Sequence, residues 1–171
     1  MTYDPLSSSP PPLPTGAARD PGDAWVEGPD GQRYWGRFGA AGLLAWHVEA
    51  GILLQHRAVW SHHGGTWGLP GGARNQHESA HDAALREAYE EAGVPADAVS
   101  PLFESELDLG FWSYTTVAVR VVRLFAPIVA DAESVALRWV PLSEVDALPL
   151  HPAFDTAWPA LRQRLHEHAE A

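Results

Sequence analysis

The sequence predicts an α+β fold, an α/β/α sandwich in which a mixed β-sheet lies between helices, with a short hairpin before it. Three observations indicate this. Segments rich in aromatic and β-branched residues recur along the chain. A helix-forming segment between them carries cap residues at both ends. The two kinds of segment are too intermixed for two domains, so we predict one domain over 23–171, after a flexible Pro-rich tail over 1–22.

The strand-like segments follow one another from residue 25. Trp25-Val26-Glu27 and Arg33-Tyr34-Trp35 flank the turn signal Gly28-Pro29-Asp30-Gly31, which predicts the hairpin. Residues 98–109 alternate only weakly between apolar and polar side chains. The core strands are predicted at 38–46, 51–57, 112–125 and 136–140.

The segment 80–92 has the strongest helix signal in the chain. It holds five alanines and no glycine or proline. Ser79 suits the N-cap, with Asp82 at the capping-box position, and Gly93 suits a left-handed C-cap. A turn of helix is predicted at 142–147 and an amphipathic helix at 152–168.

Three carboxylates gather on one face of this predicted helix. Glu87, Glu90 and Glu91 are helix neighbours, because residues three and four apart lie on the same side. Such anions repel one another unless a hard divalent cation takes their oxygens as ligands. A solvated acidic face is the alternative, and the residues around the helix decide between the two.

The flanking residues fit the pattern G-x5-E-x7-R-E-U-x-E-E-x-G-U, where U is apolar. The chain therefore resembles the Nudix hydrolases, and Ala88 is a small residue for its aliphatic place. The likeness extends over about 36–165, through Leu53–Ala58, Trp67–Gly72 and Arg138–Leu142. The matched positions are Gly72, Glu78, Arg86, Glu87, Ala88, Glu90, Glu91, Gly93 and Val94.

The resemblance implies hydrolysis of a nucleoside diphosphate linked to another moiety, with Mg²⁺ or Mn²⁺ as cofactor. The metal ligands would be Glu87, Glu90 and Glu91, with the backbone carbonyl of Gly71. Arg86 and Glu78 would pair and orient the helix. The resemblance points to Arg57 and Gly72 as substrate-binding residues, and a surface ion pair is the alternative for Arg57. As the base that takes a proton from water it points to Glu133, with Asp131 as second choice; a glutamate of the motif, or a plain exposed loop acid at these positions, are the alternatives.

The substrate is predicted to be a nucleoside triphosphate, normal or oxidised. Some ADP-ribose enzymes carry a proline a short distance after the motif, and residues 107–111, which occupy that stretch, contain none. Some dinucleoside-polyphosphate enzymes carry a tyrosine at a similar distance, and Tyr114 lies slightly further along the chain than that position. An ADP-ribose or nucleotide-sugar diphosphatase, or a non-catalytic ligand sensor, are the alternatives. Base-stacking candidates are Trp60, Phe111, Trp112 and Tyr114.

Two histidine patterns invite other interpretations. His77-Glu78-Ser79-Ala80-His81 matches the zinc-peptidase motif H-E-x-x-H. That chemistry needs both histidines on one helix face, and an N-cap at Ser79 puts His77 before the helix. His62-His63 lie in a Gly-rich segment that could contact substrate or metal, although a plain surface loop is the simpler interpretation.

Composition limits the remaining classes. The chain has no cysteine, which excludes disulfides and thiolate sites, and no apolar run long enough to span a bilayer. The start does not resemble a secretory signal, so we expect a cytoplasmic protein. A net charge of -11 argues against nucleic-acid polymers as partners. A homodimer is compatible with the sequence, and the hairpin tryptophans could cover a partner or the domain's own sheet.

Overall fold

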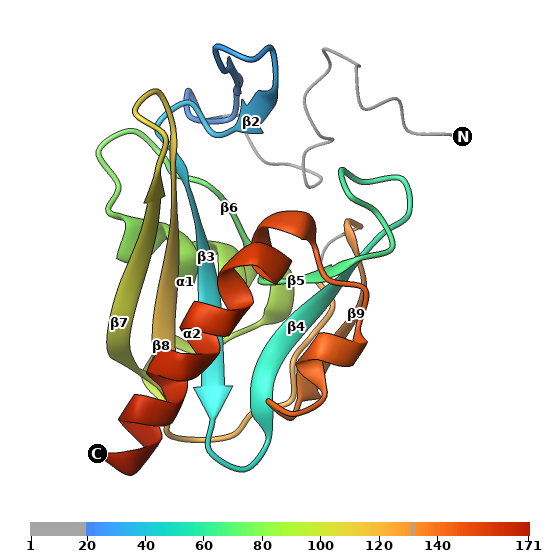
Figure 1. The fold of residues 1–171 in the computed structure, drawn as a ribbon, viewed down its shortest axis with the longest axis vertical. Helices are drawn as coiled ribbons and strands as arrows, with labels where there is room; N and C mark the ends of the chain where they lie inside the picture. The colour runs from blue at the N-terminus through green and yellow to red at the C-terminus, as the bar shows by residue number, and fades with distance from the viewer. Residues whose placement is uncertain (1–19, 131) are drawn as a thin grey trace.

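The computed structural model describes residues 20–130 and 132–171. A seven-stranded mixed sheet forms its centre, with α2 (Pro152–Glu170) in front and α1 (Ala80–Ala92) behind, as Figure 1 shows. The predicted sandwich is confirmed. The strands are β3 (Ala40–His47), β4 (Gly51–Arg57), β5 (Trp67–Gly68), β6 (Gly71–Ala73), β7 (Val99–Asp108), β8 (Ser113–Val121) and β9 (Ser134–Val140).

The topology makes β3 the middle strand of the sheet. It runs parallel to β8 and antiparallel to β4 and β6, giving the order β5-β4-β3-β8-β7, and β9 pairs with β4. Successive strand residues point to opposite faces. On β3, Leu43 therefore packs toward α1, while Leu44 and Trp46 pack toward Trp158 and Leu161 of α2.

The predicted hairpin is confirmed as β1 (Trp25–Glu27) paired with β2 (Arg33–Trp35), at the top of Figure 1. It attaches to its own chain, because the Trp112 indole N–H donates to the Trp35 carbonyl at 3.2 Å. Of the predicted tail, only residues 20–22 lie in the described part. Gly22 joins the fold through its carbonyl, which accepts the Arg37 N–H at 2.9 Å.

Helix α1 begins and ends where its caps predict. The Ser79 hydroxyl accepts the Asp82 N–H at 3.0 Å, and Gly93 adopts a left-handed conformation with φ of 66°. His77 lies before the helix with φ of 65° and cannot share a helix face with His81. The zinc-peptidase interpretation is therefore excluded.

Other predictions differ from the structure in detail. The weakly alternating segment is the ten-residue edge strand β7, whose register shifts between Pro101 and Phe103. An edge strand with exposed residues needs no strict alternation. The predicted helical turn at 142–147 is the 3₁₀ turn η2 (Val145–Ala147), and η1 (Ala96–Ala98) was not predicted. Within the described residues, no helix is long and apolar enough to cross a membrane.

Candidate functional site

Arg86 of α1 is the centre of the predicted site. Its Nε and Nη2 donate to the two carboxylate oxygens of Glu78 at 2.8 and 3.0 Å. Nη2 also donates to the Ala73 carbonyl at 3.0 Å, and Glu78 accepts the Asn75 N–H at 2.8 Å. The Arg86 hydrogen bonds hold the pKa of Glu78 below its usual value. The predicted pair therefore forms, and it ties the loop before α1 to the helix.

The same guanidinium also contacts two of the predicted metal ligands. Arg86 Nη1 lies 2.9 Å from Glu87 Oε1 and 3.4 Å from Glu90 Oε2. Glu87 is largely buried, whereas the Glu90 side chain is 54% exposed. The exposed carboxylate can change rotamer at low cost, while the buried one is fixed by its surroundings.

Glu87 is held in an environment that disfavours its charge. The pKa of its carboxyl is raised to about 7, chiefly by burial; Arg86 opposes this rise, and the nearby charges of Glu90 and Asp23 add to it. A cation placed beside such a carboxylate stabilises its charged form. Sequence reasoning missed Asp23, because nothing in its local pattern shows that the chain before β1 reaches α1.

Gly72 gives Glu87 the room that it occupies. A Cβ on Gly72 would lie 2.6 Å from the Glu87 Cδ and within 2.8 Å of both carboxylate oxygens. Gly71, its neighbour in β6, is crowded by backbone instead, since a Cβ there would lie 2.4 Å from the Ala41 carbonyl oxygen. The two glycines are therefore required for different reasons.

Gly72→Ala is expected to lower kcat/KM by about 100-fold, because the new methyl group displaces the Glu87 carboxylate. The protein should stay folded, since a side chain can move aside. Gly71→Ala is the matched control and should instead lower the melting temperature strongly. Steady-state kinetics and thermal unfolding of both variants check this, and full activity of Gly72→Ala would contradict it.

Glu91 is oriented from the opposite side. Its Oε2 accepts the Gly71 N–H at 3.0 Å and the Gln55 side-chain N–H at 3.3 Å. Gln55 is only 2% exposed and also donates to the Ser134 hydroxyl, which links α1, β4 and β9. Sequence reasoning missed Gln55. A polar residue following three apolar ones in a buried strand was the signal that could have found it.

The donor set fits a hard divalent cation. Glu87, Glu90 and Glu91 offer only oxygen atoms, which Mg²⁺ and Mn²⁺ prefer. In the described residues, these carboxylates are not gathered within 4.8 Å of one another. Glu90 is the most exposed of the residues that contact Arg86, with a side chain that is 54% exposed. The Gly71 carbonyl stays a predicted ligand, and the contact that the structure shows between Gly71 and Glu91 is through the Gly71 N–H.

Arg57 and Glu133 lie at the end of β4 and the start of β9. Arg57 pairs in register with Ser134, and the Ala58 N–H donates to the Glu133 carbonyl at 2.7 Å. The Arg57 Nε donates to the His62 carbonyl at 2.9 Å, so the guanidinium lies against the loop after β4. The Gln55–Ser134 link connects this region to Glu91. Asp131 lies outside the described residues.

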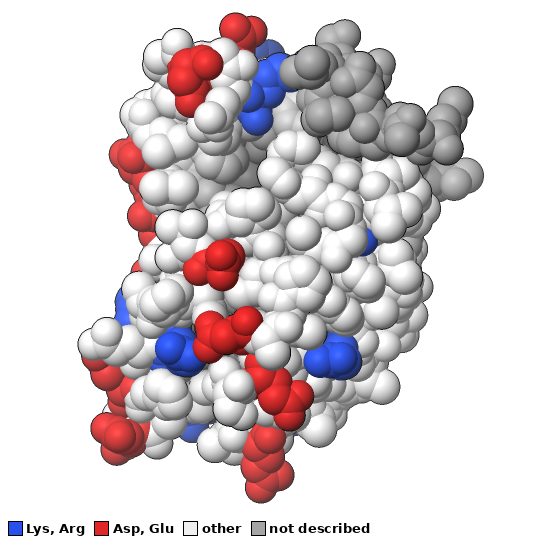
Figure 2. Space-filling view, turned by 45° about the vertical axis from the view of Figure 1, so that its right-hand side comes forward, with Lys and Arg blue, Asp and Glu red and all other residues white. Residues whose placement is uncertain are grey.

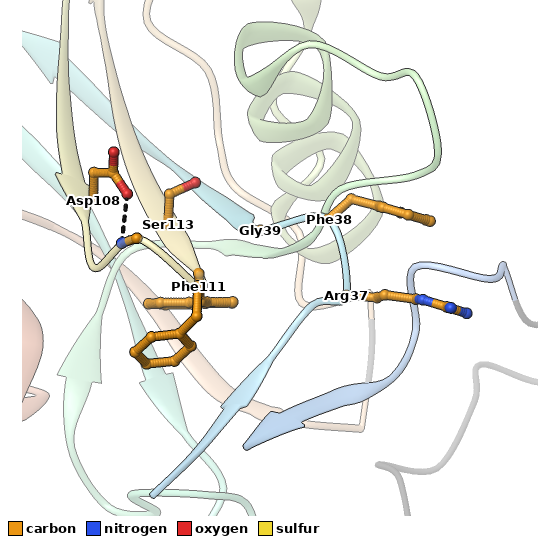
Figure 3. Close-up of a pocket in the computed structure, with 8 residues that line it drawn as sticks. Arg37, Phe38, Gly39, Asp108, Phe111 and Ser113 are labelled. Carbon is orange, nitrogen blue, oxygen red and sulfur yellow. Dashed lines mark hydrogen bonds between the residues drawn. The ribbon is translucent and has the colours of Figure 1, made fainter. Parts of the chain in front are cut away.

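A small aromatic pocket lies where the hairpin meets the β7–β8 turn, and Figure 3 shows its lining. Its volume is about 180 Å³. Tyr34 packs against Phe111 and Trp112, with ring centroids 5.4 and 4.8 Å apart. Among the predicted stacking residues, Phe111 and Trp112 line the pocket and Trp60 and Tyr114 do not. The lining residues are Arg37, Phe38, Gly39, Asp108, Gly110, Phe111, Trp112 and Ser113.

Comparisons with known proteins show which family the chain and its fold match. The NUDIX domain family model matches residues 36–162. A Mycobacterium tuberculosis H37Rv protein named "Putative 8-oxo-dGTP diphosphatase 3" is 46% identical over 162 residues, covering 89% of this chain and 74% of that protein. A Bifidobacterium longum nucleoside triphosphate pyrophosphatase/Nudix hydrolase fusion protein is 38% identical, over 92% of this chain and 34% of its own length. The crystal structure of the M. smegmatis Nudix hydrolase RenU superposes with a TM-score of 0.78 at 44% identity, covering 85% of this chain and 96% of that one.

Proposed function

This chain belongs to the NUDIX family of hydrolases that act on phosphoric anhydrides, and from that premise we propose that it is an Mg²⁺- or Mn²⁺-dependent nucleoside triphosphate pyrophosphohydrolase. One observation carries the proposal. Arg86 binds Glu78 on one side and Glu87 and Glu90 on the other, while Gly71 and Gln55 hold Glu91. A ligand set of oxygen donors with supporting hydrogen bonds is what metal-assisted phosphate chemistry requires.

The reaction proposed is the attack of water on a phosphorus atom of the triphosphate, which releases a nucleoside monophosphate and pyrophosphate. A divalent cation held by Glu87, Glu90 and Glu91 supplies charge stabilisation and lowers the pKa of water. Arg57 would contact phosphate oxygens, and the backbone of Gly72 would be a further substrate contact. Glu133 would accept the proton of the attacking water.

The proposed substrate class rests on three supports. A relative that is 46% identical carries a name that refers to 8-oxo-dGTP, and a second relative's name refers to nucleoside triphosphates. The Phe111 and Trp112 rings beside the pocket offer an aromatic surface that suits a nucleobase. An ADP-ribose or nucleotide-sugar diphosphatase and a non-catalytic sensor are the remaining candidates.

A free nucleotide suits the surface charge better than a nucleic-acid polymer. The net charge is -11, and the face in Figure 2 shows acidic and basic side chains scattered, with no broad basic patch. Duplex binding needs such a patch to neutralise phosphates. The cytoplasmic location and the homodimer stay predictions from the sequence.

A substrate panel tests the proposal. We expect pyrophosphate release from nucleoside triphosphates, oxidised ones included, with Mg²⁺ or Mn²⁺ and none with chelator. Cleavage of ADP-ribose to AMP, with kcat/KM above that of every triphosphate, would favour the alternative diphosphatase. Tight metal-dependent ligand binding without turnover of any compound would favour the sensor.

Glu133→Gln is expected to lower kcat by about 100-fold with metal saturating, while KM and metal affinity change little. The reason is that glutamine accepts a hydrogen bond but cannot take the proton. Glu144→Gln, at an exposed glutamate shortly after β9, is the matched control and should leave the rate unchanged. An unchanged kcat for Glu133→Gln would remove this residue from the mechanism.

A further inference from the structure

Three histidines converge at some distance along the chain from the acidic residues. His62 and His63 lie in the loop 58–66 between β4 and β5, and His151 is the N-cap residue of α2. Each offers a ring nitrogen, and these nitrogens lie within 4.8 Å of one another. Across 20–130 and 132–171, no other group of three histidine, aspartate or glutamate side chains is gathered so closely.

The loop presents its two histidines in a fixed arrangement. The Arg57 guanidinium donates to the His62 carbonyl at 2.9 Å, and the Thr66 hydroxyl donates to the His63 carbonyl at 2.6 Å. The Gly65 N–H closes the loop onto the Arg57 carbonyl at 2.9 Å. His63 itself has φ of 54°, a conformation that costs energy for a non-glycine residue and is often kept for a functional reason.

The surroundings keep the three rings neutral. Burial and, after it, neighbouring charges lower the pKa of His151 to about 3 and of His62 to about 4, and they lower the pKa of His63. The His62 and His63 rings are tilted against each other with centroids 4.1 Å apart, and the His63 and His151 rings form a T-shaped contact at 4.6 Å. Neutral imidazole is the form that binds transition metals.

We propose that His62, His63 and His151 form a second metal site, selective for a borderline-soft cation of the Zn²⁺ class. Three imidazole nitrogens suit Zn²⁺, whereas the carboxylates of α1 suit Mg²⁺ or Mn²⁺. Tetrahedral Zn²⁺ with bonds of about 2.0 Å brings its ligand nitrogens to roughly 3.3 Å from one another, so a modest closing of the rings completes the site.

Two features limit the affinity of this site. The Arg57 charge opposes a cation, and it lies close enough to lower the pKa of all three histidines. His151 Nδ1 also accepts the Ala153 N–H at 3.2 Å, capping α2. If the metal takes Nδ1, that acceptor is lost directly. If it takes Nε2, the ring proton must sit on Nδ1, and the acceptor is lost again. We therefore expect the bound metal to exchange readily, and metal binding to weaken the N-cap of α2.

The test is Zn²⁺ binding by the full chain, measured by competition with a chromophoric chelator. His63→Asn keeps a residue that tolerates positive φ, and His151→Asn keeps a good N-cap. His77→Asn is the matched control, because His77 also has positive φ and lies outside the cluster. Loss of a hydrogen bond that supports a metal ligand weakens metal binding by roughly 10- to 100-fold. We expect His63→Asn and His151→Asn, which each remove a ligand, to weaken Zn²⁺ binding by more than this. His77→Asn should bind like the wild type.

Two further readouts separate this site from the acidic one. Glu90→Gln should retain Zn²⁺ binding, and Co²⁺ in place of Zn²⁺ should give a tetrahedral visible spectrum that His63→Asn abolishes. Hydrogen exchange of the Ala153 amide should speed up when Zn²⁺ is added. Equal Zn²⁺ affinity in all three histidine variants would overturn the proposal. Loss of Zn²⁺ binding in Glu90→Gln, with binding kept in the histidine variants, would also overturn it. A third contrary result would be that His63 and His151 are needed to bind inorganic phosphate but not to bind Zn²⁺.

Discussion

Replacing Glu87 by glutamine is expected to cut hydrolysis by about 100-fold or more and, at the same time, to stabilise the protein measured without divalent metal. The activity falls because a metal ligand loses its charge. The stability rises because the native structure buries this carboxylate in a site that disfavours ionisation. The two effects have one cause, because the negative charge that binds the metal is unfavourable in this buried site when no metal is bound.

The pH dependence follows from the direction of the shift. The pKa of Glu87 rises from 4.5 to about 7 on folding. Between these values the unfolded chain has already lost the proton that the native carboxyl keeps, so native stability falls as the pH rises through this window. Above about pH 7 the loss is complete and amounts to about 3 kcal/mol. Below pH 4.5 both states hold the proton and the effect disappears.

Urea unfolding of wild type and Glu87→Gln in chelator, at pH 8 and at pH 4, checks this prediction. The variant should be more stable at pH 8 and equal at pH 4. Added Mg²⁺ should stabilise the wild type and reduce the difference, because a ligand that binds only the native state raises its stability. Glu144→Gln, at an exposed site, should change neither value. A variant less stable than wild type at pH 8 would contradict the argument.

Local chemistry explains why much of this could be predicted from sequence. The Ser79 and Gly93 caps act within a few residues, so they set the bounds of α1 and, with them, the face that carries Glu87, Glu90 and Glu91. The hairpin is equally local, because its turn residues lie between its two strands. These two elements could be predicted because the signal of each is contained in one short window, whereas the short 3₁₀ turn η1 was missed.

Contacts between distant segments could not be predicted in the same way. Gln55 meets Glu91 only because α1 covers the face of the sheet to which Leu53 and Gln55 of β4 point. The charge of Asp23 acts on Glu87 only because of the path that the chain takes before β1. His62 and His151 come together because β5 lies beside the start of α2, where the His151 N–H donates to the Trp67 carbonyl at 2.7 Å. Such pairings depend on topology, for which a single sequence carries little local signal.

Arg86→Lys is expected to destabilise the protein by about 2 kcal/mol and to lower kcat/KM by more than about 10-fold. Arginine presents a planar fork that bonds both Glu78 oxygens, the Ala73 carbonyl and Glu87 together. Lysine keeps the charge but offers a single nitrogen, so it leaves part of this half-buried set unsatisfied. The loss is large because Glu78 is 14% exposed and cannot recover the bonds from water.

Arg123→Lys is the matched control for this prediction. Arg123 meets Asp97 through one contact of 2.9 Å between side chains that are 57% and 80% exposed. Water replaces such a bond readily, so the expected cost is within about 0.5 kcal/mol. Chemical denaturation of both variants, with Arg86→Lys combined with Glu78→Gln in a double-mutant cycle, measures the coupling. Equal costs for the two lysine variants, or additivity in the cycle, would show that Arg86 is a surface ion pair and that the Glu87 carboxylate is oriented by something else.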